Sequence, residues 1–441
     1  MNGSDGRGIF LVLGASLLML LLLRLYRRAA NPDPEWLRKL AHIGTGLIAS
    51  SFPWIFSSRT SVFIVCSLSV ALLLAMRYLL PLRQRMSGVL DGVERQSFGE
   101  FYFPISVATL YALSHGDKIF YVIPILVLTF ADTVAALIGQ EYGKHRYEAS
   151  GSTKSWEGSV LFFTVTFLTV HIPLLLFTPV GRAESLFIAL DIGLIVMMLE
   201  AIAWRGLDNV FIPLGVFALL RIYFEMSITL LATRLLVALG LMGFVFFYRR
   251  RTTLRGNALL AGALVLYASW ALGGWRWLIA PAVLFLGYTL FYPGNPNEPE
   301  RTHNVYAVAS VSSSGLVWLL LARVWHTPNY LFPYTLAYAN HLALLAWTLI
   351  CIRPASRLPR LLPALCVVQA WLLMLLPYVA IELGSRRSLI QMALALPVCA
   401  FSFALFYWSQ PRYERGYSLE GRRWYWQAAI AFVPTLIVSL L

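Results

Sequence analysis

An acidic residue, Asp132, interrupts an apolar run that extends from about residue 119 to 138. An ionised carboxylate in such a run costs several kcal/mol unless it is paired or bound to a metal ion. A hydrogen bond to a neighbouring helix is the ordinary explanation for a residue of this kind. The polar residues that follow favour the second explanation, a carboxylate that helps to hold a metal ion.

A polar segment rich in glycine and lysine lies between Asp132 and the next apolar run. Backbone N–H groups at the start of a helix bind phosphate, and a nearby lysine adds positive charge. The predicted nucleotide-binding residues of this segment are Gly139, Gly143, Lys144, Lys154, Ser155 and Gly158. The GxxxxGK[ST] spacing of a Walker A loop is absent. A solvated basic loop would explain Lys144, but it would not explain Asp132, Lys154 and Glu157 together.

Other acidic and basic residues lie beside apolar runs in the first half of the chain. Arg38 and His42 share a face of a predicted helix, with Lys39 beside them. We expect Arg38 and Lys39 to bind nucleotide. Asp132 and Asp208 are the predicted Mg²⁺ ligands, with Asn209 as a neutral oxygen donor. The predicted catalytic residues are Asp132, Lys154, Glu157, Glu100, His42 and Glu200. Glu100, Glu200 and His42 all remain candidates for the general base.

Composition sets the class of protein that must position these residues. The chain has 441 residues, 59% hydrophobic and 13% charged, against about 25% charged in ordinary soluble domains. Its long apolar runs predict an all-α integral membrane protein with about 14–16 transmembrane helices in two consecutive helical bundles. The predicted spans are 9–24, 41–58, 60–80, 101–114, 119–138, 158–178, 186–203, 209–224, 226–247, 257–271, 276–292, 304–322, 330–352, 361–383, 388–408 and 425–441.

The net charge of +14 does not indicate nucleic-acid binding, because the basic residues lie between apolar runs. The positive-inside rule then predicts an external N-terminus and a cytoplasmic site at the surface of the lipid bilayer. No Arg- and Ser-rich transit segment begins the chain, which favours a bacterial plasma membrane over an organelle.

Acidic residues divide the chain into two parts. Sixteen of the 21 Asp and Glu residues lie at or before Glu225. Phosphoryl transfer needs carboxylates for Mg²⁺, so the chemistry belongs to the first half. We predict a catalytic membrane domain over residues 1–250 and a second, non-catalytic membrane domain over residues 251–441.

Four ordered segments of the first half resemble the phytol kinase and dolichol kinase family. They are Arg38-Lys39-Leu-Ala-His42, Gly99-Glu100, Asp132-Thr-Val-Ala-Ala-Leu-Ile-Gly139 with Gly143-Lys144 and Lys154-Ser155-Trp-Glu157-Gly158, and Glu200 with Asp208-Asn209. The resemblance implies a CTP-dependent kinase that phosphorylates a long-chain isoprenoid alcohol, such as phytol or dolichol. CDP-diacylglycerol synthases share part of the third segment, so a cytidylyltransferase that forms a CDP-linked lipid remains an alternative. A lipid transporter or flippase is the other alternative, because such proteins also carry acidic residues within membrane helices.

The second half resembles, more faintly, the membrane family that includes phytyl-phosphate kinase. The similar segments are Leu254-Arg-Gly256, Gly273-Gly274-Trp275 and Arg301-Thr-His303. That family has an Asn-Ala-Asp-Thr segment, whereas this chain has Ala339-Asn340-His341-Leu342. The missing acidic residue is why we predict no catalysis in this half.

Overall fold

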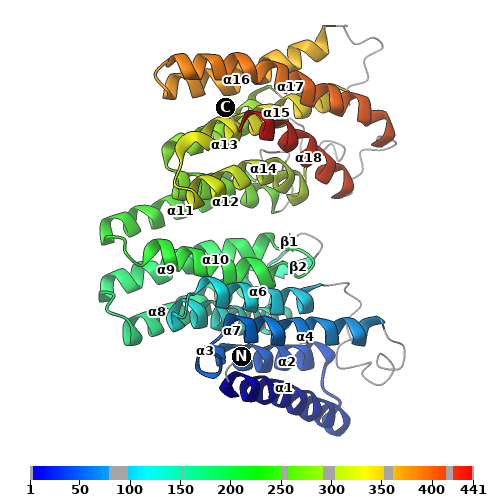
Figure 1. Cartoon of the computed structure of the whole chain (residues 1–441). Coiled ribbons are helices and arrows are strands. Elements are labelled where there is room, and N and C mark those ends of the chain that lie inside the picture. Colours follow the sequence, from blue (N-terminus) through cyan, green and yellow to red (C-terminus); the bar gives the residue numbers. More distant parts are fainter. Residues whose placement is uncertain are drawn as a thin grey trace. The chain divides into compact units, whose positions relative to one another are not determined.

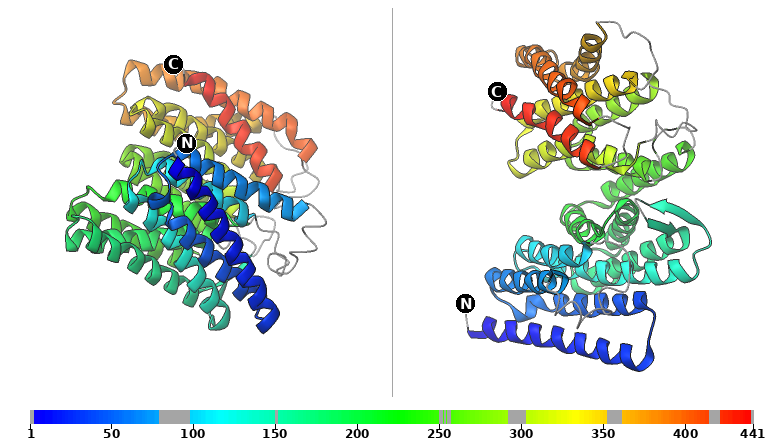
Figure 2. Two further views of the ribbon diagram at one scale, coloured as in Figure 1. Left: turned by 60° about the horizontal axis from the view of Figure 1, so that its bottom comes forward. Right: turned by 90° about the vertical axis from the view of Figure 1, so that its right-hand side faces the viewer.

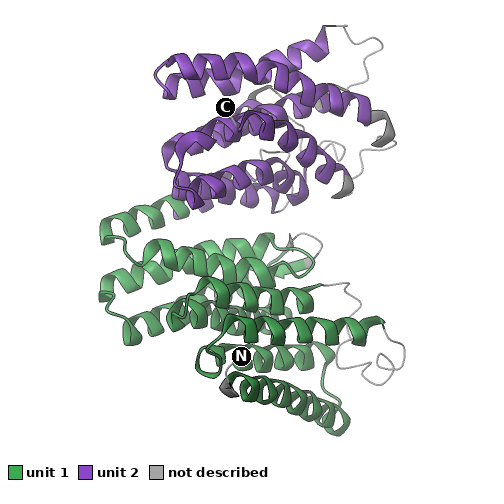
Figure 3. Ribbon diagram, viewed as in Figure 1, with its two compact units in different colours: residues 1–238 green, residues 239–441 purple. Residues whose placement is uncertain are grey.

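The computed structural model describes residues 3–78, 98–149, 152–249, 252, 254, 257–291, 303–351, 361–413 and 421–439. Almost all of these residues are helical, which confirms the all-α fold (Figure 1). The chain divides into two compact units, Met1–Ala238 (unit 1) and Leu239–Leu441 (unit 2) (Figure 3).

Unit 1 is a bundle of helices with one β-hairpin. Its elements are α1 (Gly3–Ala30), α2 (Pro34–Ser50), α3 (Phe52–Ile55), α4 (Arg59–Tyr78), α6 (Gly99–Leu113), α7 (Lys118–Glu141), β1 (Arg146–Ala149), β2 (Ser152–Ser155), α8 (Trp156–Phe177), α9 (Arg182–Ile202) and α10 (Asp208–Tyr223). The next helix, α11 (Ile228–Tyr248), contains the boundary between the units.

Helix α2 begins at Pro34, seven residues before the predicted start of that span at residue 41. The Asp33 side chain accepts hydrogen bonds from the backbone N–H groups of Glu35 and Trp36, and Pro34 occupies the first helical turn. Both features favour helix initiation. Arg38 and Lys39 therefore lie within this helix, which agrees with the shared helix face predicted for Arg38 and His42.

Helix α7 is the centre of unit 1, because it packs against α2, α8 and α10. Figure 2 shows the helices of this unit from two further sides. Gly46 of α2 permits close approach to α7: a Cβ atom there would lie 2.0 Å from Thr129 Oγ1. Small residues allow this kind of close packing between membrane helices.

A two-stranded antiparallel hairpin follows α7, where the sequence predicted only a polar turn. Tyr147 pairs with Lys154 across the strands, and its hydroxyl lies 2.8 Å from Ser159 Oγ at the start of α8. Burial raises the pKa of Tyr147. The hairpin is therefore anchored to α8, and this fixes the position of Lys154.

Unit 2 is a second helical bundle. Its described elements are α12 (Ala258–Gly273), α13 (Trp275–Phe291), α14 (Val305–Val324), the 3₁₀ helix η2 (Pro328–Tyr330), α15 (Leu331–Cys351), α16 (Leu362–Ile381), α17 (Arg386–Tyr413) and α18 (Gly421–Val438). Helix α15 packs against α13, α14, α16, α17 and α18, so it forms the core of this unit.

Eight of the described helices are long and apolar enough to cross a membrane. In unit 1 they include α1, α7, α8 and α9. Helices α12 and α13 are apolar but shorter. This composition supports a multi-pass membrane protein.

Candidate active site

Asp132 of α7 forms an ion pair with Lys39 of α2, a residue 93 positions earlier in the chain. Lys39 Nζ lies 2.6 Å from Asp132 Oδ2 and 3.3 Å from the Asp132 carbonyl oxygen. His42 Nε2 lies 3.8 Å from the same Oδ2 atom and 3.3 Å from the Leu128 carbonyl oxygen. Because Lys39 is buried, its charge strongly stabilises the ionised form of the carboxylate.

A second, largely buried pair joins the hairpin to α9. Lys154 Nζ lies 2.5 Å from Glu200 Oε1 and also donates to the Glu200 carbonyl oxygen. Burial opposes the charge of Lys154, but the Glu200 carboxylate together with Asp208 and Tyr147 outweighs burial and raises the pKa of the lysine. Lys154 therefore stays protonated at neutral pH.

Asp208, the first residue of α10, connects the two pairs electrostatically. It has Coulombic interactions with Asp132 and Lys39 of one pair and with Lys154 of the other. Glu200 likewise interacts with both Asp132 and Asp208. The structure thus gathers side chains from α2, α7, β2, α9 and α10 into one charged cluster, which we call the acid–lysine cluster: Lys39, His42, Asp132, Lys154, Glu200 and Asp208.

Two other predicted residues lie at the edge of this cluster. Arg38 interacts electrostatically with Asp132 and Asp208, while its guanidinium forms two hydrogen bonds to Glu35. Asn209 follows Asp208 in α10, and its carbonyl oxygen accepts a hydrogen bond from Ser106 at 2.7 Å.

The glycines predicted to bind phosphate pack α7 against the start of α8. A Cβ atom at Gly143 would lie 2.1 Å from the Gly139 carbonyl oxygen, and one at Gly158 would lie 2.9 Å from the Ala135 carbonyl oxygen. Ser155 caps α8 by accepting a hydrogen bond from the Gly158 N–H. This packing gives Gly139, Gly143, Ser155 and Gly158 a structural role, and their contact with nucleotide stays a prediction.

Two predicted catalytic acids make ion pairs with residues outside the acid–lysine cluster. Glu157 Oε1 lies 2.7 Å from His145 Nδ1 before the hairpin, and Glu100 Oε1 lies 3.5 Å from Arg77 Nη1. Lys144 is exposed beside the hairpin. The catalytic roles of Glu157 and Glu100 and the nucleotide-binding role of Lys144 stay predictions.

Sequence reasoning missed two features of this unit. It named no partner for Lys39 within the protein, whereas the structure pairs this lysine with Asp132; its contact with nucleotide stays a prediction. It also overlooked Asp191, which is fully buried in α9 and interacts with Arg234 of α11. The signal that identified Asp132, an acidic residue within an apolar run, is equally present at Asp191.

The carboxylates of the acid–lysine cluster would suit a magnesium ion only if phosphate oxygens supplied most of its ligands. Within the described ranges, no group of three His, Cys, Asp or Glu side chains could hold a metal ion by itself. Mg²⁺ commonly uses only one or two carboxylates and completes its shell with phosphate oxygens and water. Asp132 and Asp208 interact electrostatically and are two acids of this kind, and their binding of Mg²⁺ stays a prediction.

Comparison with known proteins gives a result that agrees with this geometry. The chain is 32% identical over 199 residues to a phytol kinase of Synechocystis sp., and the alignment covers 45% of this chain and 83% of that relative. No protein-family model matches the chain. No solved structure matches it. The coverage of the relative and the level of identity establish that this chain belongs to the phytol kinase family.

Proposed function

We propose that this protein transfers the γ-phosphoryl group of CTP to the hydroxyl of a long-chain isoprenoid alcohol, such as phytol, dolichol or a related prenol. The acid–lysine cluster is the observation that supports this proposal most directly. Its two lysines and three acids come from five elements of unit 1 and interact electrostatically. The relationship to a phytol kinase supports the class of acceptor.

The reaction forms a bond between the alcohol oxygen and the γ-phosphorus. The bond from that phosphorus to the β,γ-bridging oxygen breaks, CDP leaves with the electron pair, and the hydroxyl proton passes to a base. Catalysis of such transfers consists mainly of positioning and electrostatic stabilisation. Lys39 and Lys154 are the buried cations suited to the triphosphate, and each is now paired with an acid. Binding of the nucleotide would exchange these acid partners for phosphate oxygens.

His42 is our choice among the three candidates for the base. Its Nε2 atom faces the Leu128 carbonyl oxygen and the Asp132 carboxylate, so this nitrogen carries the hydrogen. The other ring nitrogen, Nδ1, is then the basic one. Glu200 is less suitable because Lys154 contacts its carboxylate at 2.5 Å. Asp132 would stabilise the imidazolium that forms after proton transfer.

Asp132 and Asp208 would hold the magnesium ion, with Asn209 as a further oxygen donor. When bound, the ion neutralises charge on the phosphate oxygens. Before nucleotide binds, Lys39 contacts the same carboxylate oxygen of Asp132 that faces His42, so it would keep this acid ionised and oriented for the ion.

We also propose that the site faces the cytoplasm of a bacterial cell. Basic residues beside the site, including Lys144 and Arg146 in the polar segment after α7, support this orientation through the positive-inside rule. A Lys144→Cys variant should react with a membrane-impermeant maleimide in inverted vesicles and not in intact cells. Labelling in intact cells alone would reverse the proposed orientation.

The direct test uses purified protein, Mg²⁺ and CTP labelled separately at the α- and γ-phosphates. Incubation with phytol, geranylgeraniol, farnesol or a polyprenol should label the lipid only from the γ-phosphate and release CDP. Incorporation of the α-label with release of pyrophosphate would instead identify a cytidylyltransferase. Parallel reactions with UTP and ATP test the nucleotide, since an equal rate with ATP would contradict CTP specificity.

A further inference from the structure

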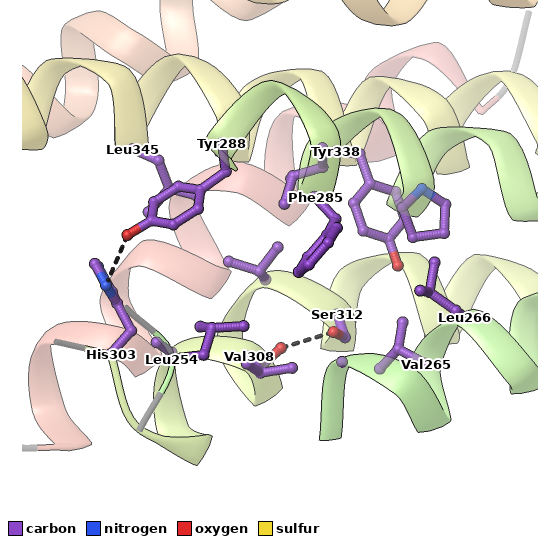
Figure 4. Close-up of a pocket in the computed structure, with 15 residues that line it drawn as sticks. Leu254, Val265, Leu266, Phe285, Tyr288, His303, Val308, Ser312, Tyr338 and Leu345 are labelled. Carbon is purple, nitrogen blue, oxygen red and sulfur yellow. Dashed lines mark hydrogen bonds between the residues drawn. The ribbon is translucent and has the colours of Figure 1, made fainter. Parts of the chain in front are cut away.

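Unit 2 contains a pocket among α12, α13, α14 and α15 (Figure 4). The empty space among its lining residues, open side and adjoining solvent included, is about 650 Å³. Most of its lining is aliphatic or aromatic, as at Val265, Leu266 and Phe285. A hydrocarbon chain suits such a lining.

One end of the pocket has a buried hydrogen-bonding pair. Tyr288 Oη lies 3.1 Å from His303 Nδ1, and the two residues are 8% and 3% exposed. Ser312 also lines the pocket, and its hydroxyl donates to the Val308 carbonyl oxygen (Figure 4). The described lining residues include no Asp, Glu, Lys or Arg. The polar end is therefore suited to a small neutral group.

We propose that this pocket binds the isoprenoid alcohol itself and prefers it to the phosphorylated product. The chain would lie against Val265, Leu266 and Phe285, and the hydroxyl would lie at the His303–Tyr288 pair. The choice of alcohol rests on the function proposed for unit 1. Unit 2 would then be a substrate-binding unit.

The absence of charge from the described lining is the reason for this choice of ligand. A phosphate placed at this buried end would lose its hydration, and the described lining has no Lys or Arg to pair with it. A bilayer phospholipid would pay the same cost if its charged head group entered this end, and its acyl chain has no hydroxyl to bond the His303–Tyr288 pair. A prenol carries only a hydroxyl there, and a hydroxyl both donates and accepts hydrogen bonds.

A larger side chain at Gly262 would fill part of the pocket. Gly262 lies in α12 and lines the pocket, and a Cβ atom built there meets nothing within 4 Å. Gly262→Leu should therefore occupy pocket space without a backbone clash, and leucine favours helix more than glycine does. Gly240→Leu in α11 is the matched control, because Gly240 is also helical with nothing within 4 Å and it does not line the pocket.

The test measures binding of a tritiated, diazirine-bearing geranylgeraniol to the full-length protein in nanodiscs without nucleotide. Photolabelled peptides from α12–α15 should fall about tenfold in Gly262→Leu and stay unchanged in Gly240→Leu. Asp132→Asn should keep the labelling, because the pocket does not use that residue. Normal labelling of Gly262→Leu would overturn the proposal.

Competition on the unaltered protein needs no variant. Unlabelled geranylgeraniol should displace the probe at a concentration at least about tenfold lower than geranylgeranyl monophosphate or phosphatidylcholine. Equal competition by the phospholipid would identify a general lipid groove and overturn the proposal. If the kinase assay fails while geranylgeraniol still competes selectively, the function proposed for unit 1 is wrong and the pocket is still an alcohol site.

Discussion

The two units differ in the kind of polar group that they bury. Unit 1 buries Lys39 and Asp191, and it pairs lysines with acids in the acid–lysine cluster. Among the described residues of unit 2, the buried polar side chains are hydroxyls, amides and imidazoles, such as Asn340, His341 and Gln427. Both units are apolar bundles, so the difference lies in charge and not in overall hydrophobicity.

The neutral groups of unit 2 connect its helices. Asn340 Nδ2 of α15 donates to the Ala431 carbonyl oxygen of α18 at 2.9 Å, and Trp318 Nε1 of α14 donates to Thr435 Oγ1 of α18 at 2.9 Å. Such bonds fix helix positions at low electrostatic cost. Buried charges cost more and are strong indications of function in membrane helices. The comparison therefore supports the proposal that phosphoryl transfer occurs in unit 1.

The largest expected effect comes from Asp132→Asn. The substitution removes the charge that pairs with Lys39 and that would bind magnesium, so phosphorylation should fall about 100-fold or more. Membrane insertion should persist, because an amide is cheaper to bury than a carboxylate. The γ-label assay measures phosphorylation, and fractionation of membranes measures insertion. Glu141→Gln, an exposed acid of the same helix, is the control. Full activity of Asp132→Asn would refute the role of this carboxylate.

A double substitution at the second pair separates folding from catalysis. Lys154→Met leaves the Glu200 carboxylate buried without its lysine, a change that costs about 3–5 kcal/mol. Adding Glu200→Gln removes the unpaired charge and should restore much of the thermal stability. Phosphoryl transfer should stay at least about tenfold reduced, because the phosphate-binding cation is still missing. Recovery of both stability and activity would show that the pair is only structural.

Gly46→Ala should have a smaller effect through helix packing. The added methyl overlaps Thr129 Oγ1, so α2 must move away from α7 at a cost of about 1–3 kcal/mol. The Lys39–Asp132 contact should lengthen, and activity should fall more than the amount of folded protein. Thermal unfolding and the γ-label assay measure the two effects. Gly14→Ala, which has nothing within 4 Å of the added atom, is the matched control. Equal stability and activity of Gly46→Ala and Gly14→Ala would contradict the close packing of α2 against α7.

Asn340→Asp tests the difference between the two units by adding a buried carboxylate to unit 2. The Asn340 amide nitrogen now faces the Ala431 carbonyl oxygen, which would repel a carboxylate oxygen at the same place. The Asn340 Oδ1 atom has no hydrogen-bond partner among the described residues, so it cannot stabilise the added charge. Thermal stability should fall by several kcal/mol, whereas activity per folded molecule should stay the same. A gain of a second phosphorylation would contradict a non-catalytic unit 2.

The sequence was enough to predict the helical membrane fold and most of the residues that gather in unit 1. Asp132, Lys154, Glu200 and Asp208 could be identified because ionised groups beside apolar runs need a reason to be there. Their partners could not be identified from the sequence. The pairing of Lys39 with Asp132 depends on how α2 packs against α7, which the Gly46–Thr129 contact determines.

Two local features could not be predicted from the pattern of apolar runs. The hairpin that holds Lys154 has only four residues in each strand, and its polar composition is equally typical of a turn. The start of α2 was predicted too late because a search for apolar runs ignores polar first turns, whereas Asp33 and Pro34 begin the helix there. Capping residues would have been the better signal for this boundary.

The smallest expected effect belongs to Glu382→Gln. Glu382 ends α16 and lies 3.8 Å from Arg276 Nη1, with about a third of its side chain exposed. Exposed ion pairs of this kind contribute about 0–1 kcal/mol, so thermal stability should change little. Phosphoryl transfer should be unchanged within assay error, because the acids of the proposed site all lie in unit 1. A loss of activity comparable to that of Asp132→Asn would contradict the assignment of the chemistry to unit 1, since it would require an acid of unit 2 in the reaction.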